Sequence, residues 1–111
     1  MLQLKEITHI RRHLQESSYA DIALFFNALG DSTRIRVFQL LMKQKNLCVT
    51  DIARVLDISL PVASHHLRLL EMLGFSKKIR KGKMQCYEVL SNPTIIALFD
   101  RFLKEYSESV T

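Results

Sequence analysis

The stretch 59-SLPVASHHLRLL-70 decides the fold, because it combines a helix start with polar residues that packing alone does not require. Ser59 is a good N-cap, and Pro61 is tolerated in the first turn because its missing N–H would have no intrahelical partner there. The side chains available for an apolar stripe are Val62, Leu67 and Leu70, with Ala63 and Leu69 at its margins. The small and polar residues that remain must face something other than the core.

A second short helix is predicted just before this stretch. Thr50 is a candidate N-cap for about two turns over 51-DIARVLD-57. The residues expected to face inward are Ile52, Ala53, Val55 and Leu56. Two short helices with a tight connection and a second cap form a helix-turn-helix. We place this motif at about residues 50–73, with Gly74 ending its second helix.

A basic β-hairpin is predicted at about residues 75–90. The segment 75-FSKKIRKGKMQCYEVL-90 contains two strand-like runs around 80-RKGK-83, with Gly82 supplying the turn. The chain carries a net charge of +5, and the window 60–83 holds six Lys or Arg against one acid, Glu71. The ten basic and ten acidic residues elsewhere cancel. A basic block confined to one region is typical of a polyanion-binding surface, although most charge runs are simply solvated.

Helices are also predicted at both ends of the chain. Apolar residues recur at helical spacing over about 3–17, a further helix is expected over about 19–29, and Asp31 or Ser32 can cap a helix over 31-DSTRIRVFQLLMK-43. Asn92 and Pro93 open a last helix, at about 93–107, which carries more apolar residues than one buried face requires. The expected fold class is mainly α with a small β-hairpin, a winged helix-turn-helix in a single domain over 1–111.

Length and composition narrow the function. A chain of 111 residues with 48% hydrophobic content suits one compact domain. Apolar runs such as 22-IALFF-26 are far below the roughly 20 residues of a bilayer span, and the charged N-terminus does not resemble a signal peptide. Two cysteines are too few for a secreted disulfide framework. We therefore expect a cytoplasmic protein without a membrane partner, and no catalytic arrangement or phosphate-binding glycine loop indicates an enzyme.

The helix-turn-helix and the basic hairpin together predict binding to double-stranded DNA, because the start of the second helix enters the major groove in this motif. The candidate helix contacts are Ser59, Pro61, Ser64, His65 and Arg68, and the candidate hairpin contacts are Lys77, Arg80, Lys81 and Lys83. We assign sequence readout to Ser64, His65 and Arg68, and general phosphate affinity to Lys81 and Lys83. The alternatives are a winged-helix module that docks an acidic protein and a helical domain whose basic turn only aids solubility.

The runs 28-ALGDSTRIRVFQLL-41 and 47-LCVTDIARVLDISLPVASHHLRLLEMLGF-75, followed by the hairpin, resemble the ArsR–SmtB family of winged-helix repressors. The resemblance spans about residues 23–90. It implies a homodimer, joined through the first and last helices, that binds a palindromic operator until an inducer releases it. Leu60 stands where members often have a glutamine, so base readout at that point is expected to differ. A constitutive DNA binder without an inducer is a further alternative.

The metal sites familiar from that family are not matched. Its arsenic and heavy-metal sensors often carry ELCVCDL where this chain reads 46-NLCVTDI-52, so Cys48 matches the first cysteine and Thr50 replaces the second. One thiolate does not chelate a soft metal alone. The family's zinc pattern in the last helix is also missing, because no histidine follows His66.

The first helix offers one candidate site for a divalent metal. Glu6, His9, His13 and Glu16 are spaced by three, four and three, so they share the helix face opposite the apolar stripe. Such a face can contribute ligands with help from another segment. The alternative is a solvated surface, and no cofactor follows with certainty.

Cys48 and Cys86 form a candidate redox pair. If the segment before Thr50 pairs as a short strand with the second hairpin strand, the two thiols come together although they are 38 positions apart. Oxidation would then tie the start of the helix-turn-helix to the hairpin, and nearby Lys77, Lys78 or Lys83 would favour a thiolate. The alternative is two unrelated, small buried residues.

Overall fold

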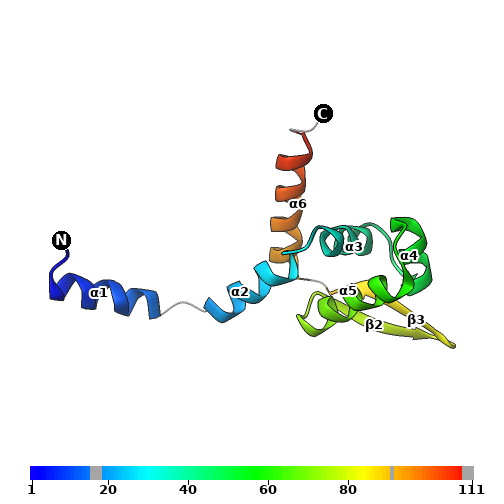
Figure 1. Cartoon of the computed structure of the whole chain (residues 1–111), viewed down its shortest axis with the longest axis horizontal. Coiled ribbons are helices and arrows are strands. Elements are labelled where there is room, and N and C mark those ends of the chain that lie inside the picture. The colour runs from blue at the N-terminus through cyan, green and yellow to red at the C-terminus, as the bar shows by residue number, and fades with distance from the viewer. Residues whose placement is uncertain (16–18, 91, 109–111) are drawn as a thin grey trace.

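The computed structural model describes residues 1–15, 19–90 and 92–108. Its elements are α1 Leu4–Gln15, α2 Tyr19–Ala28, α3 Ser32–Lys43, β1 Leu47–Cys48, α4 Val49–Leu56, α5 Leu60–Met72, β2 Ser76–Lys81, β3 Met84–Val89 and α6 Pro93–Glu108. The strands form an antiparallel sheet in the order β1-β3-β2, beside the helices α3, α4 and α5 (Figure 1). The predicted fold class, a winged helix-turn-helix that is mainly helical, is confirmed.

The hydrophobic core lies between α3, α5 and the sheet. Phe38 of α3 is almost completely buried, and its ring meets the rings of Phe75 and Phe99 edge-on at centroid distances of 5.6 and 4.9 Å. Edge-to-face aromatic pairs of this kind are favourable beyond the area they bury. Phe38 therefore joins α3 to the entry of the hairpin and to the first turns of α6.

Three helix starts have the predicted caps. The side chains of Asp31, Ser59 and Asn92 accept backbone N–H hydrogen bonds in the first turns of α3, α5 and α6, at 2.9–3.2 Å. Gly74 follows α5 with φ 82°, and Gly82 in the hairpin turn has φ 63°. Both angles lie in the left-handed region that favours glycine, which explains why α5 and β2 end where they do.

Helix α4 starts two residues earlier than predicted. The helix begins at Val49 with Cys48 as its N-cap, and Thr50 is already inside the first turn. The Cys48 N–H donates to Asp51 Oδ2 at 3.1 Å, so a carboxylate three residues into the helix secures its start. Strand β1 consequently runs into α4 without a connecting loop.

The buried faces of α4 and α5 also differ from the prediction. Val55 and Val62, both expected to pack inward, are exposed. The buried stripe of α5 is Ala63, His66, Leu67 and Leu70. This set has the spacing three, four and seven of a single helix face, and a buried histidine completes it. The predicted apolar stripe included Leu67 and Leu70 correctly, but it began with Val62 instead of Ala63 and omitted His66.

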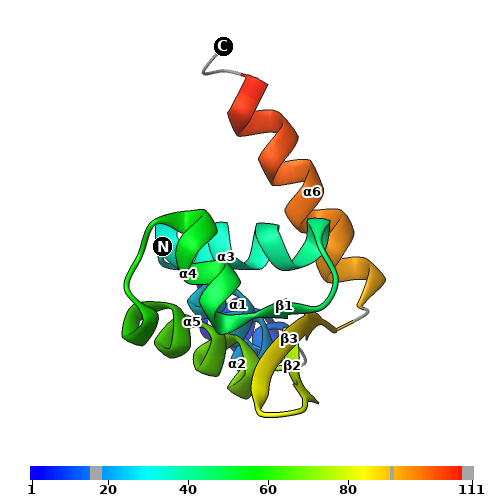
Figure 2. The same ribbon diagram turned by 90° about the vertical axis from the view of Figure 1, so that its right-hand side faces the viewer.

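The helices outside the core are only partly covered. Helices α1 and α2 extend from the core as an arm, and α6 projects from the side opposite α5 and the hairpin (Figures 1 and 2). The radius of gyration is 18.2 Å, whereas a compact domain of this length is expected near 13 Å. Helix α1 has no buried residue. None of the described helices combines the length and hydrophobicity needed to cross a membrane.

Candidate nucleic-acid interface

The start of α5 presents the predicted contact residues on its outer face. This face lies opposite the buried stripe and carries Pro61 and the residues three, four and seven positions after it, Ser64, His65 and Arg68. Ser64 is half-buried, whereas the other three and the cap residue Ser59 are exposed. The fold therefore brings all five predicted residues of α5 to one accessible surface.

The tip of the hairpin borders the same surface. Figure 2 shows α5 and the hairpin on one side of the molecule. Between them lies an open hollow of about 310 Å³, which we call the α5–wing hollow. It is lined by Cys48, Val49, Thr50, Leu60, Ser64, Lys83, Met84 and Gln85. Ser64 of α5 and Lys83 of the hairpin turn thus lie on the rim of one feature, and helix and hairpin form a continuous surface.

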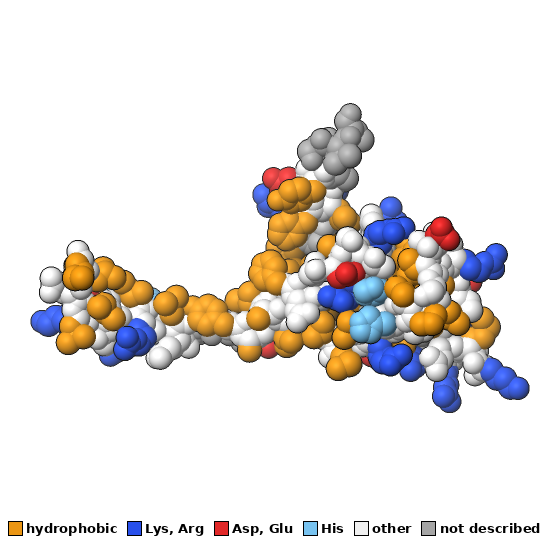
Figure 3. Space-filling model, viewed as in Figure 1, with side chains coloured by type: hydrophobic (Ala, Val, Ile, Leu, Met, Phe, Trp, Pro, Cys, Tyr) orange, Lys and Arg blue, Asp and Glu red, His pale blue; other side chains and the backbone are white. Residues whose placement is uncertain are grey.

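The basic side chains of the hairpin differ in their surroundings. Lys77 Nζ lies 3.1 Å from Glu88 Oε1 on the neighbouring strand, and Lys78 Nζ lies 6.0 Å from the ring centre of Tyr87. Arg80, Lys81 and Lys83 are exposed towards the tip, where basic side chains project from the molecule (Figure 3). A paired lysine is less available to a phosphate than a free one. The tip residues are therefore better placed for phosphate contact than Lys77.

A buried polar network behind α5 was not predicted from the sequence. His66 is buried, and its Nε2 lies 3.7 Å from Asp31 Oδ2. The Arg34 guanidinium is also buried and donates to the carbonyls of Ala28 and Asn27 at 2.7 and 2.8 Å. The end of α2 is thereby linked to α3, and α3 to α5. One feature of the sequence could have revealed that His66 is buried: it lies between Ala63 and Leu70 on the same helix face.

The electrostatics of this network follow from burial and local hydrogen bonds. Burial lowers the pKa of His66, and the positive charge of Arg34 acts in the same direction, while Asp31 opposes them. The backbone N–H of Arg34 lowers the pKa of Asp31, and the attraction of His66 adds to this effect. At neutral pH the pair is therefore a neutral imidazole beside a carboxylate.

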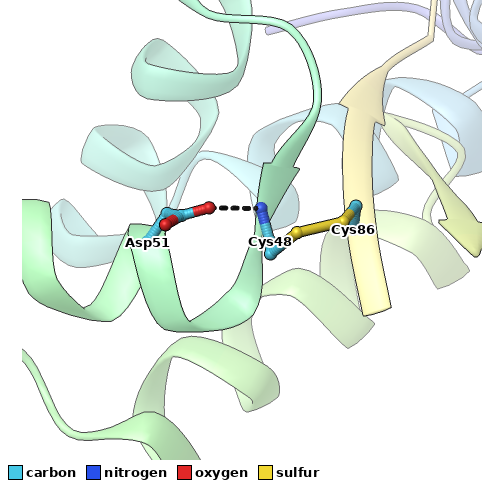
Figure 4. Close-up of a disulfide and its surroundings, with 3 residues drawn as sticks. All are labelled: Cys48, Asp51 and Cys86. Atoms are coloured by element: carbon cyan, nitrogen blue, oxygen red, sulfur yellow. Dashed lines mark hydrogen bonds between the residues drawn. A yellow bond between two sulfur atoms is a disulfide. The ribbon is translucent and has the colours of Figure 1, made fainter. Parts of the chain in front are cut away.

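The two cysteines lie opposite each other. Strand β1 pairs with β3 so that Cys48 faces Cys86, the Cα atoms are 3.8 Å apart and the sulfurs form a disulfide (Figure 4). The predicted pairing of the segment before α4 with the second hairpin strand is confirmed. The alternative of two unrelated buried residues is wrong, although both side chains are buried.

The first helix holds three of the four candidate metal ligands, and Glu16 lies outside the described residues. The rings of His9 and His13 are 4.5 Å apart between centroids, and Glu6 Oε1 accepts the N–H of Gln3 at 3.4 Å. Within the described ranges, no group of three or more His, Cys, Asp or Glu is placed to hold a metal ion. A metal site completed by another segment stays a prediction.

Comparison with known proteins agrees with this geometry. The family model for bacterial regulatory proteins of the arsR family matches residues 31–78, from the start of α3 into β2. A cadmium resistance transcriptional regulatory protein CadC homolog from Staphylococcus aureus is 36% identical over 84 residues, which cover 76% of this chain and 69% of the relative. The chain belongs to the arsR family. A transcriptional repressor SmtB homolog from Synechocystis is 30% identical over 93 residues, covering 83% and 70% of the two chains.

Solved structures share the fold of this arsR-family chain. The homodimeric winged helix-turn-helix DNA-binding domain of Mb0332 from Mycobacterium bovis has a TM-score of 0.71 at 24% identity, covering 84% of each chain. The antimony-specific transcriptional repressor AntR has a TM-score of 0.74 at 23% identity, covering 84% of this chain and 85% of its own. Membership of the arsR family makes the chain a DNA-binding transcriptional regulator and not an enzyme.

Proposed function

We propose that this chain is a homodimeric repressor that binds a palindromic operator through α5 and the hairpin and leaves it when an inducer acts. The observation that carries the proposal is the continuous surface formed by the outer face of α5 and the hairpin tip around the α5–wing hollow. Helix-turn-helix proteins place such a helix in the major groove while flanking elements contact the backbone.

The contacts divide by chemistry. Ser64, His65 and Arg68 project from the outer face of α5 and can reach base edges, where an arginine reads guanine through two hydrogen bonds. Arg80, Lys81 and Lys83 at the tip supply phosphate contacts that do not depend on sequence. The N-terminal end of α5, with Ser59 and Pro61, adds a helix dipole directed at the backbone. Lys77 is a weaker candidate because Glu88 pairs with it.

The helices beyond the core supply a dimer interface. An apolar groove of about 490 Å³ lies between α2 and α6 and is lined by Phe25, Phe26, Leu29, Ile35, Phe99, Phe102, Leu103 and Tyr106. Hydrophobic side chains continue along the arm formed by α1 and α2 (Figure 3). A second copy related by a two-fold axis would cover both surfaces. Two recognition helices related in this way match a palindromic site with half-sites about one helical turn apart.

Metal ions are one class of inducer to consider, because a relative is named for cadmium resistance. In this chain Thr50 stands beside the disulfide-bonded Cys48, so that position offers no second thiolate for a soft metal. The face of α1 that carries Glu6, His9 and His13 is the remaining candidate for a divalent ion. It would need a further ligand from another segment or from the second copy.

The proposal is tested by fluorescence anisotropy with two duplexes of equal length. One carries the sequence immediately upstream of the chain's own coding region, and the other has a mixed sequence. We expect the reduced protein to bind the upstream duplex about a thousandfold or more tightly than the mixed one. Absence of binding to either duplex, with retention on an acidic peptide surface, would favour the winged-helix module that docks proteins.

A further inference from the structure

Leu60 is an exposed leucine at the start of α5 that neither caps the helix nor belongs to the core. Ser59 provides the cap, and the partly buried Ile58 packs against the core from the position before it. The buried stripe of α5 begins only at Ala63. Leu60 itself is 48% exposed. Neither the start of the helix nor the core therefore explains an apolar side chain at this position.

The side chain of Leu60 lies on the proposed DNA-binding surface, between α5 and the hairpin (Figure 2). It lines the α5–wing hollow together with Ser64, which is four residues on and therefore its neighbour on the helix surface. Met84, an exposed residue of the hairpin, lines the same hollow. Apolar side chains thus lie beside Ser64 and Lys83, the residues assigned to base and phosphate contact.

A leucine at the start of a DNA-reading helix has a chemical counterpart in the major groove. The N-terminal residues of such a helix contact base edges. Most groups on these edges are hydrogen-bond donors or acceptors, whereas the C5-methyl group of thymine is apolar. A polar base group placed against leucine would lose its water and gain no partner, which is unfavourable. The methyl group of thymine loses nothing there and gains an apolar contact.

We propose that Leu60 reads the C5-methyl group of one thymine in each half-site of the operator. This inference rests on the proposed function and identifies a base that the operator must contain. Leu60 distinguishes thymine from cytosine by an apolar contact, whereas His65 and Arg68 discriminate through hydrogen bonds. Cytosine at the same place lacks the methyl group and presents an amino group that needs an acceptor.

The spacing along α5 separates this contact from the others. Leu60, Ser64 and Arg68 follow one another at intervals of four residues and form one row on the helix. Eight residues of α-helix rise by about 12 Å, which corresponds to between three and four base pairs at about 3.4 Å each. Leu60 and Arg68 therefore address different base pairs, and the thymine lies at the end of the half-site that faces the start of α5.

The size of the effect follows from the area that one methyl group buries. Removing one buried methyl group lowers affinity about fourfold. A dimer on two half-sites makes the contact twice, so that removing both methyl groups should lower affinity about tenfold or more. A protein without the leucine side chain should be far less sensitive to the same change in the DNA.

The test changes the protein and the DNA together. Wild type, Leu60→Ala and Met72→Ala are titrated by fluorescence anisotropy against the upstream duplex and against the same duplex with deoxyuridine in place of every thymidine. Uracil differs from thymine only by the missing methyl group, so the hydrogen-bonding pattern of the major groove is kept. Met72 is the matched control, because it is an exposed apolar residue at the other end of α5 and does not line the hollow.

We expect deoxyuridine to weaken binding by the wild type and by Met72→Ala at least about tenfold, and binding by Leu60→Ala less than about threefold. Circular dichroism checks that both variants are folded. Equal weakening of all three proteins, or no weakening of the wild type, would overturn the thymine contact and leave the proposed function intact. A wild type that binds the upstream and mixed duplexes equally would overturn the proposed function itself.

A second measurement needs no variant. Replacing the thymines of the upstream duplex by uracil one at a time should reveal one sensitive thymine in each half-site, at symmetric positions. Cytosine at that position should weaken binding, and 5-methylcytosine should bind about fourfold more tightly than cytosine, because the methyl group returns to the same ring carbon. Equal binding of the cytosine and 5-methylcytosine duplexes would overturn the methyl contact.

Discussion

His66 Nε2 lies 3.7 Å from Asp31 Oδ2, so α5 is linked to the N-cap of α3. Asp31 also accepts the backbone N–H of Arg34 at 2.9 Å. The buried imidazole has no hydrogen-bond partner at Nδ1 among the described residues. A protonated imidazole would carry a charge and an additional N–H into this buried position. The packing of α5 against α3 is therefore most favourable while the His66 imidazole is neutral.

We predict that the protein loses stability when the pH falls from 7.5 to 5.5. The folded-state pKa of His66 is lowered below its ordinary value of 6.5, mainly by burial. The unfolded chain therefore takes up the proton first, and the stability present above pH 6.5 is lost as the pH falls below it. The pKa of Asp31 is lowered from 3.8, so the stability that its carboxylate contributes is lost only below about that pH. Thermal unfolding should show a lower midpoint at pH 5.5 than at pH 7.5.

The variant His66→Gln should remove most of this pH dependence, because glutamine keeps a polar group near Asp31 without titrating. His65→Gln is the matched control, since His65 is the exposed neighbour on the same helix. The control should keep the wild-type difference between the two pH values. An unchanged difference in His66→Gln would show that another group is responsible.

A second prediction concerns Arg34. Its guanidinium is buried and donates to two backbone carbonyls at the end of α2. We expect Arg34→Leu to reduce the free energy of unfolding by about 2–3 kcal/mol, because both carbonyls lose a charged donor. Urea denaturation measures the change. Arg36→Leu, at an exposed position two residues on, should cost less than about 0.5 kcal/mol, and equal losses would contradict the assigned role.

Local signals in the sequence predicted much of the fold. Asp31, Ser59 and Asn92 cap helices as expected, and Gly82 forms the hairpin turn. These features depend on residues within a few positions of one another, so they can be predicted from short stretches of the sequence. The last helix carries an apolar surplus that the sequence also showed, and Phe99, Phe102 and Tyr106 of that helix line the apolar groove.

Features that depend on distant residues were harder to predict. His66 is buried beside Asp31, which is 35 positions earlier, and an apolar pattern gives no sign of a polar partner at that distance. The pairing of Cys48 with Cys86 was expected as a possibility only, because strand spacing does not specify which residues lie opposite each other. Cys48 also replaced Thr50 as the cap because Asp51 secures the backbone one turn on.

The proposed dimer gives a third prediction. Phe102 lines the apolar groove and is 45% exposed in the single chain. Phe102→Glu would bury a carboxylate in the interface, so we expect light scattering at micromolar concentration to report a monomer. Val55→Glu is the control, because Val55 is an exposed apolar residue of α4 that does not line the groove. A monomeric wild type, or dissociation by both variants alike, would contradict the assigned interface.

The division of DNA contacts gives a fourth prediction. Arg68→Ala should cost about 1–3 kcal/mol on the upstream duplex and much less on a mixed duplex, because it removes a base contact. Lys83→Ala should weaken both duplexes alike, because it removes a phosphate contact. Lys104→Ala on α6, away from α5 and the hairpin, serves as the control. Equal losses on both duplexes for Arg68→Ala and Lys83→Ala would refute the division.

The salt dependence of binding to a mixed-sequence duplex tests the central claim most directly. If Arg80, Lys81 and Lys83 of two protomers each contact a phosphate, log K should fall with log salt with a slope of about −5. Anisotropy titrations of the reduced wild type between 50 and 300 mM salt measure this slope. A slope near that value supports a DNA-binding surface made by α5 and the hairpin tip. Binding that is absent at low salt, or that does not change with salt, would contradict it.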